Sequence, residues 1–88
     1  MINGKRQVEA LAWHDLEGVP EPYRVKYELY GELVILKIRT IHYEKKQLPD
    51  NTLYMCYECE SIGYETNKNL NLEYDMGTGK WYMVHQHQ

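Results

Sequence analysis

Apolar and polar residues alternate along most of this chain from Tyr23 onward, and this pattern restricts its possible folds strongly. Tyr23, Val25, Tyr27 and Leu29 alternate with charged or polar residues. Successive side chains of an extended strand point to opposite faces, so a period of two predicts strands with one buried face. The pattern predicts strands over residues 23–30, 33–46, 52–60, 69–75 and 80–86, and leaves 61–69 open as a loop or a short extra hairpin.

Turn residues between these segments predict how the strands pair. Gly31-Glu32 fits a two-residue type II′ loop, which needs glycine at its first central position. In the resulting register, Arg24 lies opposite Arg39 and Lys26 lies opposite Lys37. These four cations would then share the face that points away from the core.

A second hairpin is expected near the end of the chain. A loop over residues 76–79 would place Tyr74 opposite Trp81 and Leu72 opposite Met83. Those four side chains would contribute to the apolar face of the sheet, because opposite residues in a ladder point to the same side.

The segment before the first strand predicts a helix over residues 5–17. Val8, Leu11, Ala12 and Leu16 recur at helical spacing and form one apolar stripe. Gly18, followed by two prolines, ends the element. The expected fold is therefore α+β, with one helix packed on a curved five-stranded antiparallel meander. A small β-barrel with the helix as a plug is the alternative.

Length and composition set the outer limits of the prediction. The 88 residues fit one domain, 1–88. No segment approaches the roughly 20 apolar residues of a membrane helix, and the N-terminus lacks the apolar block of a secretory signal. Two cysteines are too few for a disulfide scaffold, so a cytoplasmic location without membrane contact is expected.

The four cations of the first predicted hairpin form the leading candidate site. Like charges directly opposite each other in a ladder are destabilising, so a ladder of cations indicates a surface that binds acidic groups. Apolar and aromatic residues are expected on the same outer face and would anchor a partner. The candidate binding residues are Arg24, Lys26, Lys37, Arg39, Leu33, Ile35, Tyr30 and Tyr43.

These residues predict a small binding module, an inhibitor or accessory protein that contacts another protein or a second copy of itself. Complementary charge would set its specificity. Nine tyrosines and no phenylalanine fit a sheet whose rings meet both apolar and polar surroundings. Weak binding of single-stranded nucleic acid or another anion is an alternative, although the net charge of −3 disfavours strong binding to phosphate backbones.

A zinc site is the third possibility. Cys56 and Cys59 have the two-residue spacing of zinc ligands, and His85 and His87 could complete a set of four. Residues three apart in a strand point to opposite faces, however, so both sulfurs could bind one metal only if the chain turned there. No cofactor is therefore expected.

The sequence offers no support for an enzyme. Its four histidines are scattered, and it has neither a nucleophile elbow nor a phosphate-binding glycine loop. A catalytic site is not expected.

Overall fold

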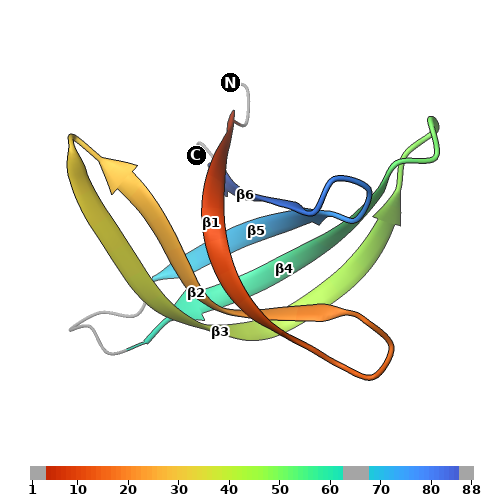
Figure 1. The fold of residues 1–88 in the computed structure, drawn as a ribbon, viewed down its shortest axis with the longest axis horizontal. Coiled ribbons are helices and arrows are strands. Elements are labelled where there is room, and N and C mark those ends of the chain that lie inside the picture. The colour runs from red at the N-terminus through yellow and green to blue at the C-terminus, as the bar shows by residue number, and fades with distance from the viewer. Residues whose placement is uncertain (1–3, 63–67, 86–88) are drawn as a thin grey trace.

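The chain forms a closed barrel of six antiparallel strands, joined in sequence order from β1 to β6 and back to β1 (Figure 1). The computed structural model describes residues 4–62 and 68–85. The expected α+β fold is wrong, because the described residues contain no helix. The strands are β1 (Gly4–His14), β2 (Pro20–Leu29), β3 (Glu32–Gln47), β4 (Leu53–Ser61), β5 (Asn69–Asp75) and β6 (Lys80–His85).

The segment expected to be a helix is strand β1. Val8, Ala10 and Ala12 also alternate at a spacing of two, and all three belong to the core or pack against it. Leu16, which completed the helical stripe, lies in the β1–β2 loop and is fully exposed. The alternative fold shares the closed sheet with the structure, but its helical plug does not exist, because these residues are one wall of the barrel.

Two long strands close the barrel by changing partners along their length. Strand β1 pairs with β6 over residues 4–8 and with β2 over residues 9–14. Strand β3 pairs with β2 over residues 32–37 and with β4 over residues 38–47. The β2–β3 hairpin therefore extends beyond the rest of the sheet as an arm (Figure 1).

Two bulges interrupt these ladders. Leu11 pairs with Arg24 but Ala12 pairs with Pro22, so Tyr23 is an extra residue in β2. In the same way, the β3–β4 register skips Ile41. A bulge bends its strand and changes which face the following side chains occupy.

The turn of the β2–β3 arm differs from the expected one. Its central residues are Tyr30 and Gly31, with φ angles of 50° and 79°. Two positive φ values define a type I′ turn, whose twist matches that of the flanking strands. The prediction of a Gly31-Glu32 loop is therefore wrong by one residue at the turn, and each β2 residue faces a partner two positions earlier in β3.

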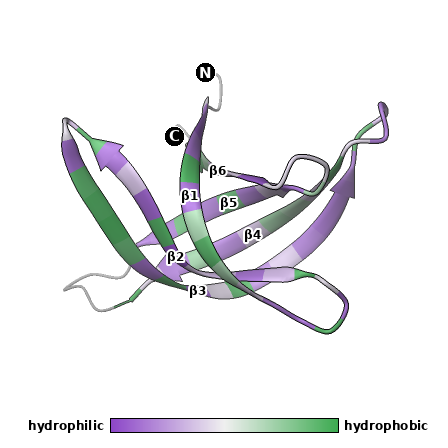
Figure 2. Cartoon of the chain, in the orientation of Figure 1, coloured by the Kyte–Doolittle hydropathy of each residue, from purple (hydrophilic) through white to green (hydrophobic). Residues whose placement is uncertain are grey.

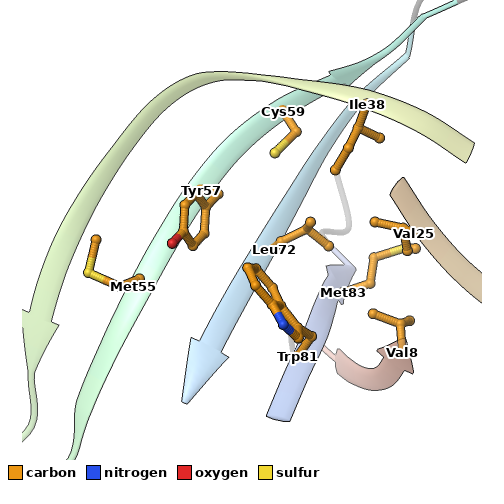
Figure 3. Close-up of a cluster of buried hydrophobic side chains, with 9 residues drawn as sticks. All are labelled: Val8, Val25, Ile38, Met55, Tyr57, Cys59, Leu72, Trp81 and Met83. Atoms are coloured by element: carbon orange, nitrogen blue, oxygen red, sulfur yellow. The ribbon is translucent and has the colours of Figure 1, made fainter. Parts of the chain in front are cut away.

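The core fills the interior of the barrel. Tyr57 on β4 lies among side chains contributed by all six strands, and Figure 3 shows how they converge. Its ring contacts that of Trp81, with centroids 5.5 Å apart. The expected pairing of the last hairpin is confirmed. The buried cluster comprises Val8, Val25, Ile38, Met55, Tyr57, Cys59, Leu72, Trp81 and Met83.

Hydropathy is distributed unevenly along β3. Its first half, in the β2–β3 arm, is hydrophobic, and its second half is mainly hydrophilic (Figure 2). Across the part of the chain that the structure describes, no helix has the length and apolar character needed to cross a membrane.

Candidate functional site

Most of the predicted site residues lie on the outside of the three strands β1, β2 and β3. Two rows cross these strands: Leu11 faces Arg24, which faces Lys37, and Glu9 faces Lys26, which faces Ile35. We call this surface the β1–β2–β3 face and define it by Leu11, Arg24, Lys26, Leu33, Ile35 and Lys37. Because the register differs from prediction by two residues, the cations keep their predicted face although their partners change.

The expected ladder of two like-charged pairs is reduced to one. Arg24 lies opposite Lys37 rather than Arg39. Arg39 instead forms an ion pair with Glu60 of β4, and the Lys26 Nζ lies 3.3 Å from Glu9 Oε2. Among residues 4–62 and 68–85, no acidic side chain forms an ion pair with either member of the Arg24–Lys37 pair.

Apolar side chains lie beside this cationic pair. Leu11 is 53% exposed and Ile35 is 49% exposed, values that are high for large aliphatic side chains. They line a groove of about 230 Å³ together with Glu9, Ala10, Arg24 and Lys26. Leu33 lies further along the arm and is also exposed. The groove thus combines apolar walls with uncompensated positive charge.

A pair of stacked rings borders the face and was missed by the sequence analysis. Trp13 of β1 stacks on Tyr23 of β2, with centroids 4.8 Å apart and planes inclined by 24°. Tyr23 is the extra residue at the β2 bulge, so a regular strand pattern could not reveal its contact with Trp13. Tyr30 lies in the turn at the tip of the arm, and its side chain is 96% exposed.

Tyr43 does not lie on the β1–β2–β3 face, where the sequence pattern places it. Because the bulge at Ile41 reverses the alternation, Tyr43 pairs with Tyr57 on the inner side of the sheet. The two ring centroids are 5.9 Å apart. Tyr43 nevertheless remains half exposed, because it lies near an open end of the barrel.

The two cysteines lie on opposite faces of β4. Cys59 is buried in the core, and burial raises the pKa of its thiol to about 11. Cys56 is outside, where partial burial and the neighbouring Glu73 carboxylate raise its thiol pKa. The two sulfurs therefore do not converge on one metal. His87 and the side chain of His85 lie outside the described residues.

Within the described ranges, no group of three or more His, Cys, Asp or Glu side chains is arranged to hold a metal ion.

Comparison of the chain with protein-family models, with curated proteins and with solved structures found no match.

Proposed function

We propose that this chain is a non-enzymatic binding module that recognises an acidic segment of another protein through the β1–β2–β3 face. The observation that carries the proposal is the Arg24–Lys37 pair, in which two cations face each other without an acidic partner among the described residues. Such a pair costs a few tenths to about 1 kcal/mol of stability. A bound carboxylate would offset this cost.

The apolar neighbours of the pair support a protein as the partner. Leu11 and Ile35 are exposed in the groove beside it and would bury their side chains against apolar residues next to the carboxylate. Interfaces gain affinity from such buried contacts, while complementary charge sets specificity and association rate.

Both described cysteines are free thiols, which supports a reducing compartment such as the cytoplasm.

Single-stranded nucleic acid is the competing partner, and the Trp13–Tyr23 stack beside Arg24 favours it. Two features favour protein instead. Lys26 and Arg39 already form ion pairs with glutamates, and the chain has a net charge of −3. Binding to phosphate backbones gains affinity with each phosphate that is neutralised, so two unpaired cations support only weak binding.

A selection from a displayed library of random peptides tests the proposal. We expect the immobilised chain to enrich peptides that carry Asp or Glu next to apolar residues. The double variant Arg24→Glu/Lys37→Glu should lose at least tenfold in affinity for the selected peptides, measured by calorimetry. A matched variant, Lys45→Glu/Lys68→Glu, changes the net charge equally but lies off the face, and should bind as the wild type does.

The outcomes separate the partner classes. Equal loss of binding in both variants would show that overall charge, not this face, attracts the peptides. Enrichment of basic or uncharged peptides would contradict the proposal. Titration with a labelled single-stranded oligonucleotide at low and moderate salt tests the competing partner, because phosphate contacts lose affinity as salt rises. Sedimentation of the wild type alone reports whether a second copy occupies the face.

A further inference from the structure

A second concave site lies at the end of the barrel where the β1–β2 loop approaches β3 and β4. The β1–β2 loop and the second half of β3 lie at this end of the molecule in Figure 1. The cleft has a volume of about 350 Å³. It is separate from the groove on the β1–β2–β3 face. The residues that line it are Trp13, His14, Asp15, Val19, Pro20, Glu21, Tyr43 and Tyr57.

Three aromatic side chains from three different strands line this cleft. Tyr57 is 2% exposed and forms the floor, while Tyr43 is 50% exposed and Trp13 is 65% exposed. The Tyr43 and Tyr57 centroids are 5.9 Å apart, and their planes are inclined by 31°. Tyr23 stacks against Trp13 and so supports that ring. The face of an aromatic ring carries partial negative charge and attracts cations.

Negative charge surrounds the same cleft. Asp15 and Glu21 both line it, and none of its described lining residues is a lysine or an arginine. The Asp15 carboxylate also accepts hydrogen bonds from the backbone amides of Glu17 and Val19, at 2.9 and 2.8 Å, which hold the loop in place.

We propose that this cleft binds an alkylated ammonium group, with the cation held between the Trp13 and Tyr43 rings and the Glu21 carboxylate. Aromatic rings combined with carboxylates are the usual means by which proteins recognise quaternary ammonium groups. A plain anion would be repelled by Asp15 and Glu21. A neutral apolar ligand would fit the rings but gain nothing from the two carboxylates.

Titration of the intact chain with choline and with 3,3-dimethyl-1-butanol tests the charge requirement. The two molecules have the same shape, but only choline is charged. We expect choline to bind at least about tenfold more tightly, which corresponds to a cation–π contribution at a partly desolvated site. Equal affinity for both molecules, or no binding of any cationic probe, would overturn the proposal.

A pair of peptides identifies the source of the ammonium group. One peptide carries trimethyl-lysine and the other carries unmodified lysine at the same position. Tighter binding of the trimethylated peptide than of choline would indicate a modified protein, whereas tighter binding of choline would indicate a small molecule. Either result supports the site, because both ligands carry the same charged group.

Variants locate the site within the molecule. Tyr43→Ala and Glu21→Gln should each weaken binding of the preferred probe at least fivefold, while Tyr43→Phe, which keeps the ring, should bind almost as the wild type does. The matched controls Tyr30→Ala and Glu28→Gln change the same residue types elsewhere. If the preferred probe binds Tyr43→Ala and Glu21→Gln as tightly as it binds the controls, the cleft is not its site.

Discussion

The hydroxyl of Tyr57 allows a sharp test of how the barrel is held together. Tyr57 on β4 is 2% exposed, and its hydroxyl donates a hydrogen bond to the backbone carbonyl of Pro20 on β2. These two strands are not neighbours in the sheet. The bond therefore joins opposite walls of the barrel at the end where the β1–β2 loop begins. We consider the variant Tyr57→Phe.

The expected loss can be estimated from what the variant removes. Phenylalanine fills the same space apart from the hydroxyl, so no large cavity forms. The Pro20 carbonyl, however, loses the hydroxyl that donates to it. Leaving one buried acceptor unsatisfied costs about 1–3 kcal/mol. For a domain of this size, each kcal/mol lowers Tm by about 4–8 °C.

Urea and thermal unfolding of Tyr57→Phe would measure this cost directly. The control is Tyr30→Phe, because Tyr30 is 96% exposed and its hydroxyl lies in solvent. We expect the control to unfold within about 0.5 kcal/mol of the wild type. If Tyr57→Phe is as stable as the control, the hydrogen bond does not hold the two walls together and the reasoning fails.

The pH dependence gives an independent check on the same group. Burial raises the pKa of Tyr57 above its ordinary value of 10.0. The unfolded chain therefore releases this proton at lower pH than the folded chain does. The stability that Tyr57 contributes is complete below pH 10 and falls as pH rises above that value. This component of the alkaline loss should be absent in Tyr57→Phe, measured as the difference in unfolding free energy between pH 8 and pH 11.

Three further predictions concern other parts of the barrel. Lys37→Glu places an acid opposite Arg24. It should therefore raise the unfolding free energy by up to about 1 kcal/mol and weaken partner binding. A loss of stability would contradict the like-charge interpretation. Tyr30→Asn creates the Asn-Gly pair that type I′ turns prefer and should raise Tm by a few degrees in calorimetry, whereas a lower Tm would contradict the turn assignment. Burial raises the pKa of Cys59 to about 11, so the stability that its neutral thiol contributes should decline between pH 9 and pH 11. In urea titrations at those two pH values, the unfolding free energy of Cys59→Ala should decline less than that of the wild type.

The sequence predicted the strands after the first turn well because their signals are local. Residues 69–75 form β5 as expected, and Tyr74 pairs with Trp81 through the predicted loop. Alternation and turn residues act over a few positions, so a single sequence contains most of the information needed. The same argument explains why the boundaries of the other later strands were predicted within a few residues.

The error at β1 has a non-local cause. Residues 5–17 satisfy a helical stripe, and Ala10 and Ala12 are compatible with a helix. They form a strand because β2 and β6 offer backbone partners on both sides of β1. Closing the sheet pairs the backbone hydrogen-bonding groups at these strand edges and buries Val8. This gain depends on strands outside the segment, so no pattern within the segment can reveal it.

The candidate site shows which errors of register matter. At the arm, the predicted turn was wrong, but each residue of β2 shifted by two positions relative to β3. Because side chains alternate with a period of two, Arg24 and Lys37 still point outward. At Ile41, one extra residue was enough to move Tyr43 from the outer face to the inner side.

This difference matters for the proposed ammonium site. The single bulge at Ile41 brings Tyr43 next to Tyr57, and the bulge at Tyr23 brings a second ring onto Trp13. Trp13, Tyr43 and Tyr57 line the cleft at the end of the barrel, and neither contact follows from regular alternation. Removal of Ile41 from the chain would remove the bulge but keep Tyr43 opposite Tyr57 on the inner side, because the Thr40–Cys59 and His42–Glu58 pairs would then be consecutive. A shortened chain that still folds should therefore keep both ammonium binding and the Arg24–Lys37 pair, as measured by calorimetry with choline and with an acidic peptide, and a loss of choline binding alone would contradict the placement of Tyr43 in the cleft.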